Sequence, residues 1–61
     1  MKDRKEILRK IDQIKIDNYQ NEDRIKHFTE ANMPERVEIY NRMIEANNNK
    51  LEMLYWVLNQ E

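Results

Sequence analysis

Two groups of side chains in this sequence could do chemistry: a single histidine and a row of glutamates. His27 has no second histidine and no cysteine in the chain to join it, whereas zinc sites need three or four convergent donors. Glu38, Glu45 and Glu52 recur at heptad intervals, which places them on one helical face. Paired catalytic carboxylates also need a shielding pocket. We therefore expect a surface histidine and a solvated acidic row, with no metal ion and no cofactor.

Residues for covalent or phosphate chemistry are scarce. Serine is absent, Thr29 is the one threonine, and no phosphate-binding glycine loop can form without glycine. The segment Asn41-Arg42-Met43-Ile44-Glu45 keeps only an apolar residue followed by an acid. In size and helical-hairpin shape the chain resembles the sporulation-type aspartyl-phosphate phosphatases of bacilli, but their Ser-Gln-Glu-Leu-Asp signature is not matched there. The sequence therefore predicts that the protein is not an enzyme.

The composition is that of one small helical domain. The chain has 61 residues, of which 38% are charged, with no glycine, no cysteine and one proline. Such a mixture favours helices over strands and tight turns. No apolar run reaches membrane-spanning length and no signal peptide is recognisable, so we expect a cytoplasmic protein. The abundance of Asn, Lys, Ile and Glu is typical of a bacterial or phage genome rich in A and T.

The proline lies near the middle of the chain and predicts a two-helix hairpin over residues 1–61. We expect one helix over about 4–31, a turn at about 32–34 and a second helix over about 34–59. Asp3 and Glu6 have the spacing of a capping box, in which Asp3 accepts from the backbone N–H of Glu6. Asn32 suits two roles, either a left-handed residue after the first helix or the N-cap of the second.

Both helices carry a heptad seam, and the two seams agree on one antiparallel register. Spacings of three and four residues select Ile7, Ile11, Ile14, Asn18, Asn21, Ile25 and Phe28, and then Val37, Tyr40, Ile44, Asn47, Leu51, Leu54 and Leu58. Folding the chain back at residues 32 and 33 sets each position of the first set against one of the second. Asn18 then faces Asn47, and Asp17 lies near Lys50. An antiparallel coiled-coil hairpin is the predicted fold.

The asparagines in the seam have two interpretations. A buried Asn pair costs stability but penalises shifted registers, because a slip sets each amide against a leucine or isoleucine. Alternatively, Asn18, Asn21 and Asn47 mark a wet, loosely packed waist.

The second helix has more apolar surface than a hairpin needs. Beside its seam runs a second stripe, and two aromatic residues follow near its end; together they form the candidate interface: Ile39, Met43, Ala46, Lys50, Met53, Tyr55, Trp56 and Val57. Apolar stripes of this length are unusual on monomers. We expect a homodimer in which the second helices pack antiparallel into a four-helix bundle, with docking of a different protein as the alternative. The expected function is that of a small regulatory or adaptor protein.

Basic residues concentrate at the start of the chain and suggest an alternative function. The first sixteen residues contain Lys2, Arg4, Lys5, Arg9, Lys10 and Lys15 against the acids Asp3, Glu6 and Asp12. A dimer would double this basic surface. The alternative is thus an RNA- or DNA-binding regulator that contacts phosphates through these six side chains.

Overall fold

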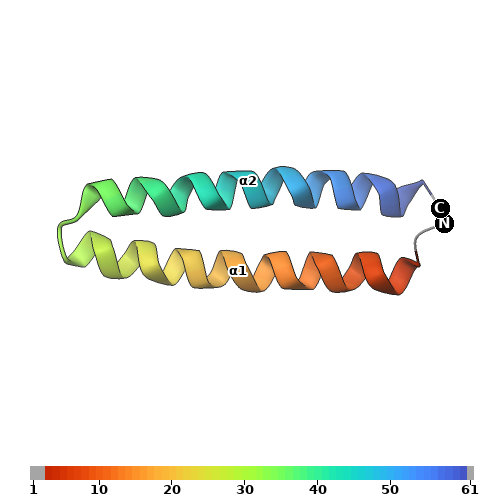
Figure 1. Ribbon diagram of the computed structural model, residues 1–61, viewed down its shortest axis with the longest axis horizontal. Helices are drawn as coiled ribbons and strands as arrows, with labels where there is room; N and C mark the ends of the chain where they lie inside the picture. The colour runs from red at the N-terminus through yellow and green to blue at the C-terminus, as the bar shows by residue number, and fades with distance from the viewer. Residues whose placement is uncertain (1–2, 61) are drawn as a thin grey trace.

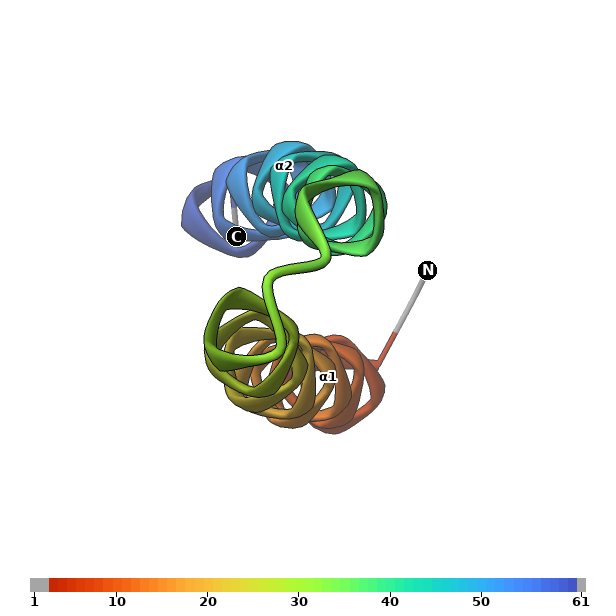
Figure 2. The same cartoon turned by 90° about the vertical axis from the view of Figure 1, so that its left-hand side faces the viewer.

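The computed structural model describes residues 3–60, which form two antiparallel helices packed side by side (Figure 1). Helix α1 spans Arg4–Glu30 and helix α2 spans Pro34–Asn59. The hairpin measures 46 × 15 × 12 Å, and the view along its length shows one helix lying over the other, without a third layer (Figure 2). Neither helix contains a stretch long and apolar enough to cross a bilayer.

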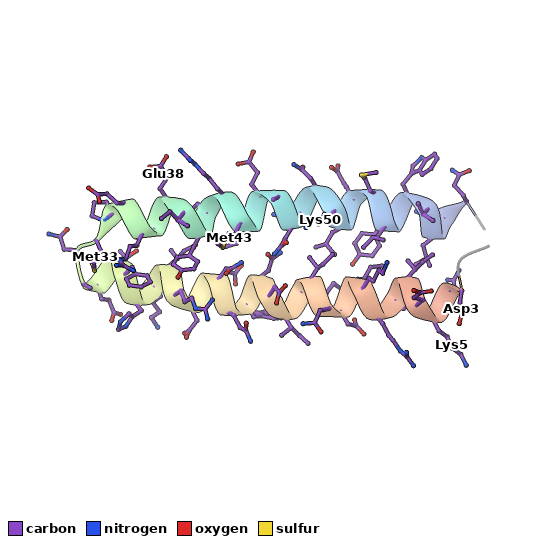
Figure 3. All side chains as sticks on the ribbon, in the orientation of Figure 1. Asp3, Lys5, Met33, Glu38, Met43 and Lys50 are labelled. Carbon is purple, nitrogen blue, oxygen red and sulfur yellow. The ribbon has the colours of Figure 1, made fainter. Side chains whose placement is uncertain are left out.

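Helix α1 begins at a cap that differs from the expected capping box. The Asp3 side chain accepts a hydrogen bond from the backbone N–H of Lys5, at 3.2 Å. The N–H groups of Glu6 and Ile7 donate to the Asp3 backbone carbonyl instead. The cap is present, and its carboxylate lies at the positive end of the helix dipole, but it binds the second N–H of the helix rather than the third. Figure 3 labels Asp3 and Lys5.

The turn ends α1 with a left-handed residue, which settles the role of Asn32. Asn32 has φ 59° and is the only residue of the described chain with positive φ. Its N–H donates to the carbonyl of Thr29 at 3.1 Å, and the N–H of Met33 donates to Phe28 at 2.9 Å. These two bonds define a Schellman motif. Met33 then precedes Pro34, which starts α2 because proline suits the first turn of a helix.

The heptad seam accounts for all of the shielded surface. Among residues 3–60, the fourteen predicted seam positions are the only ones that are buried or half-buried. Ile7 and Ile11 are 1% and 2% exposed, whereas no residue of α2 is fully buried. The apolar pattern therefore identifies the helix–helix contact correctly, and α2 remains the more exposed helix.

The predicted facing of Asn18 and Asn47 is confirmed. The Asn47 Nδ2 donates to Asn18 Oδ1 at 2.9 Å, and Asn18 Nδ2 donates to Asn48 Oδ1 at 3.1 Å. The carbonyl oxygen and the NH2 group of the Asn18 amide therefore both form hydrogen bonds with side chains of α2. This hydrogen-bonded layer ties the register of one helix to the other.

Asn21 adds a second polar position to the middle of the seam. It is 6% exposed, and its amide makes no hydrogen bond with another described residue. In the observed register it lies opposite Ile44. An amide in this position stabilises less than an apolar side chain would.

The left-handed residue yields a test of the turn. We expect Asn32→Ala to lower the free energy of unfolding by about 1 kcal/mol, because a Cβ is disfavoured at this φ and alanine lacks the local hydrogen bonding of asparagine. Asn32→Gly should be neutral or slightly stabilising. Thermal unfolding followed by circular dichroism measures both, and equal stabilities for the two variants would contradict the left-handed turn.

A second prediction concerns the asparagine layer. Asn47→Leu leaves the Asn18 carbonyl facing an apolar side chain and should cost about 1–3 kcal/mol. Asn18→Leu/Asn47→Leu removes both amides and should be at least as stable as the wild type. Urea unfolding measures both. A double variant no more stable than the single one would show that the two amides do not act as a pair.

Candidate functional site

Side chains next to the seam fall on two long edges of the hairpin, because an antiparallel heptad pair has flanking positions on either side. One edge, here called the stripe edge, consists of Lys10, Asp17 and Arg24 of α1 and Arg36, Met43, Lys50 and Val57 of α2. The other, here called the tyrosine edge, consists of Leu8, Lys15 and Glu22 of α1 and Asn41, Asn48 and Tyr55 of α2. All of these side chains are exposed.

The α2 stripe lies along and beyond the stripe edge. It comprises the six candidate interface residues at heptad spacing: Ile39, Met43, Ala46, Lys50, Met53 and Val57. None is covered by α1, and Ile39 and Met53 are 52% and 70% exposed. Figure 3 labels Met43 and Lys50 on α2, with Glu38 projecting away from α1. Exposed apolar side chains at this spacing form a continuous surface of the kind that binds another helix.

An open groove extends the α2 stripe across the seam to α1. Its volume is about 400 Å³, and its lining is almost entirely apolar. The lining residues are Lys10, Gln13, Ile14, Lys50, Met53 and Leu54. Since three come from each helix, a ligand in the groove would contact both helices. Two lysines, Lys10 and Lys50, stand at the borders of this mostly apolar groove.

Aromatic rings and arginines form a second feature of the stripe edge, nearer the turn. Phe28 and Tyr40 are stacked with ring centroids 5.6 Å apart and planes 7° apart. Arg24 lies over Tyr40 at 5.7 Å, and Arg36 lies over Phe28 at 5.5 Å. Each guanidinium is thereby within the range of a cation–π attraction to a ring.

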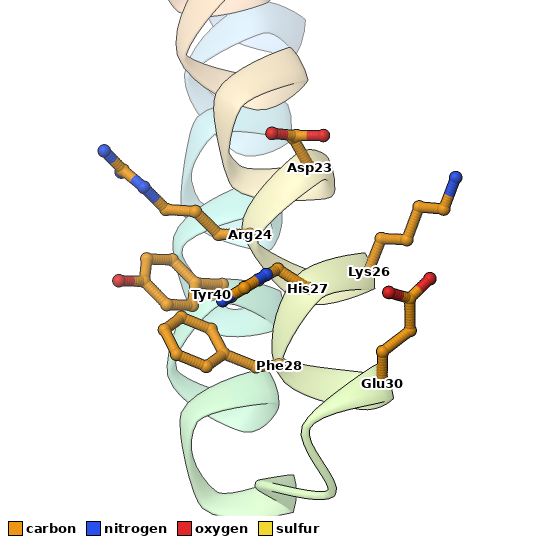
Figure 4. Close-up of a pocket in the computed structure, with 7 residues that line it drawn as sticks. All are labelled: Asp23, Arg24, Lys26, His27, Phe28, Glu30 and Tyr40. Atoms are coloured by element: carbon orange, nitrogen blue, oxygen red, sulfur yellow. The ribbon is translucent and has the colours of Figure 1, made fainter.

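A shallow hollow of about 430 Å³ borders this ring stack. Figure 4 shows Arg24, Phe28 and Tyr40 gathered on one side of it, with His27 beside them and Lys26 and Glu30 pointing the other way. His27 meets the Phe28 ring edge to face at 5.4 Å. Its imidazole therefore packs beside the aromatic pair. Within residues 3–60, no three His, Cys, Asp or Glu side chains converge as metal ligands.

The charges of the stripe edge have few internal partners. Within residues 3–60 the single ion pair is Arg42 to Glu38, at 2.8 Å, one helical turn apart on α2. Asp17, which was expected to lie near Lys50, forms no ion pair with it. The Lys50 ammonium stays at the border of the groove instead, where its stem covers apolar surface and its charge meets water.

Tyr55 and Trp56 lie apart from the other candidate interface residues. Tyr55 belongs to the tyrosine edge, where the Lys15 ammonium lies 5.8 Å from its ring centroid. Trp56 faces away from the seam and is 65% exposed. The structure thus brings together six of the eight candidates and separates these two from them.

The candidate nucleic-acid contacts do not share one face. Arg4, Lys5, Arg9, Lys10 and Lys15 occupy five different heptad positions, so their side chains point in different directions around α1. Figure 3 shows Lys5 pointing away from α2, and Lys15 is engaged by Tyr55. Lys2 lies outside the described residues.

The sequence reasoning did not identify the arginines of the ring stack as site residues. Arg24 and Arg36 flank seam positions that hold aromatic rings, and this adjacency is visible in the heptad pattern. A basic residue beside an aromatic seam residue was the signal that could have found them.

Comparisons with known proteins give no relative. No protein-family model matches the chain, and searches of curated proteins and of solved structures find no match either.

The tyrosine edge yields a titration test. Tyr55 raises the pKa of Lys15 above its usual 10.5, first by hydrogen bonding and then by charge, with smaller contributions from Asp12 and Tyr19. Because the folded state holds this proton more tightly, the stabilisation is present below the usual pKa and is lost as pH rises through the raised value. We expect Tyr55→Phe to lower the pKa of Lys15 in an NMR titration. Tyr19→Phe, as control, should change it less, and an unchanged pKa in Tyr55→Phe would contradict the assignment.

Proposed function

We propose that this chain is a small non-enzymatic adaptor or regulator that acts by docking to another polypeptide through the α2 stripe. The observation that carries the proposal is the exposure of Ile39, Met43, Met53 and Val57 on one face of α2. A helix that needed only α1 as its partner would not require a second apolar face. Covering this face would remove a large apolar area from water, at roughly 25 cal/mol for each Å² buried.

A second copy of the chain is one possible cover, and it would produce the homodimer expected from the sequence. Antiparallel packing of α2 on its copy, with the twofold axis near Ala46 and Lys50, sets Ile39 against Val57 and Met43 against Met53 of the copy. Ala46 favours this arrangement because a small side chain lets two helices approach closely. The helix of a different protein could use the same face.

Closing that dimer into a four-helix bundle also brings the two α1 helices face to face. The same axis and the hairpin register then place Asp17 opposite Asp17 of the copy, and Lys10 opposite Arg24 of the copy. Like charges in facing positions are unfavourable. The support for a dimer therefore comes from α2, and the α1 side of the stripe edge opposes a closed bundle.

The test of the docking function is a pair of double variants. Met43→Glu/Met53→Glu puts two charges into the middle of the α2 stripe and should abolish self-association or partner capture, because a charge in an apolar contact loses its hydration. Association is measured by sedimentation at micromolar concentration and by pull-down from the source cell.

The matched control changes two exposed apolar residues of α1 that lie outside the stripe. Ile16 and Tyr19 are 49% and 72% exposed, and Ile16→Glu/Tyr19→Glu adds the same charge to the same hairpin. This control should associate like the wild type. If Met43→Glu/Met53→Glu associates as strongly as the wild type, and both variants retain their helicity, the docking function is refuted.

A further inference from the structure

We propose that the occupant of the α2 stripe is an amphipathic helix of another protein with acidic side chains bordering its apolar face. This inference rests on the docking function proposed above and specifies the chemistry of the partner. Three observations carry it: the extent of the apolar surface, the sign of the charges beside it, and the absence of internal partners for those charges among residues 3–60.

The apolar surface has the length of a helix of several turns. The groove lined by Ile14, Met53 and Leu54 lies toward one end of the stripe edge, and the Phe28–Tyr40 stack lies toward the other. Gln13 at the groove and His27 beside the stack are two heptads apart in α1, which corresponds to roughly 21 Å of helix at ~1.5 Å per residue. A partner helix of about four turns would contact both features.

The charges bordering this surface are mainly positive. Along the stripe edge from the groove to the turn, the four cationic side chains are Lys10, Arg24, Arg36 and Lys50. Asp17 is the one acid among the stripe-edge residues, and Asp3 and Glu6 lie nearer the chain ends. The hollow beside the ring stack adds the acids Asp23 and Glu30 and the cation Lys26, so cations still outnumber acids along the surface. The acidic row of α2 at Glu38, Glu45 and Glu52 follows a different face of the helix. A partner with carboxylates along its borders complements this pattern, and one with ammonium groups opposes it.

These cations are available to a partner. None of the four forms an ion pair with a carboxylate of residues 3–60. Arg24 and Arg36 are also held over rings at 5.7 and 5.5 Å, which restricts them in advance of binding. A guanidinium over a ring can still donate its N–H groups to a carboxylate.

A second copy of the chain fits this edge less well than an acidic helix does. A copy brings its own Lys10, Arg24, Arg36 and Lys50 to the contact, and the twofold axis through the α2 stripe sets Lys10 opposite Arg24 of the copy. The apolar side chains of the α2 stripe can pack against either a second copy or an acidic helix. The charges beside the stripe therefore decide between the two occupants.

Two synthetic peptides test the sign of the partner. The first has 21 residues with Leu at the a and d heptad positions, Glu at e and g, and Ala or Gln elsewhere. The second is identical except for Lys in place of Glu. Each is labelled with a fluorophore and titrated with the wild-type chain by fluorescence anisotropy at low salt. We expect the Glu peptide to bind about tenfold or more tightly than the Lys peptide, a preference that shrinks as salt is added.

Charge reversal on the protein supplies the matched variants. Lys10→Glu/Lys50→Glu changes the two lysines of the groove and should reverse the preference, so that the Lys peptide binds better. Lys5→Glu/Arg9→Glu makes the same change in net charge on a different face of α1 and should preserve the preference for the Glu peptide. Circular dichroism checks that both variants retain the helicity of the wild type, and the salt series on the wild type is independent of any variant.

The outcomes separate this inference from the docking function. Equal binding of the two peptides, or a wild-type dimer that Met43→Glu/Met53→Glu dissociates, would overturn the acidic partner and leave the α2 stripe as the docking face. Glu-peptide binding that Met43→Glu/Met53→Glu does not weaken would overturn both. Preferential binding of the Glu peptide, lost in Met43→Glu/Met53→Glu and reversed in Lys10→Glu/Lys50→Glu, would support both.

Discussion

The heptad seam between α1 and α2 is the interaction on which every other feature depends. A two-helix hairpin can shield only one stripe of each helix, and the shielded residues of the described chain are the fourteen of the seam. The rest of the surface is exposed, so the proposed docking surface consists mainly of side chains that flank the seam. The Asn18–Asn47 pair at 2.9 Å adds a polar constraint on register. Because the register determines which flanking residues meet, it also determines that Lys10 and Lys50 border one groove.

The seam and its register follow from the sequence because heptad spacing and a single proline leave one consistent way to fold the chain back. Local capping was less predictable. Asp3 could reach more than one N–H of the first turn, and its carboxylate binds that of Lys5. Asn32 had two chemically reasonable roles, and the bonds from Asn32 and Met33 to α1 carbonyls select the left-handed one. These choices depend on backbone angles within a few residues, which residue identity alone does not determine.

The candidate site was only partly predictable for a related reason. Periodicity assigns Ile39 and Met53 to one face of α2, and both are exposed there. Periodicity also places Tyr55 on a different face of α2. Tyr55 and Trp56 were nevertheless included in the candidate interface because they lie beside its residues in the chain. What periodicity does not show is how side chains pair across helices. The stacking of Arg24 on Tyr40 and of Arg36 on Phe28 depends on rotamers and on the register together, so it emerges only from the packed hairpin.

The proposed docking would be coupled to folding of the hairpin through α2. Among residues 3–60 the buried side chains are Ile7, Ile11 and Asn21, all on α1, and α2 keeps its second apolar face in water. A partner that binds this face only when the hairpin is folded adds stability by mass action, about 2.7 kcal/mol at a hundred times its dissociation constant. A docked partner would in this way add stability to a hairpin whose seam is polar at its middle, where Asn18 and Asn47 are hydrogen-bonded to each other.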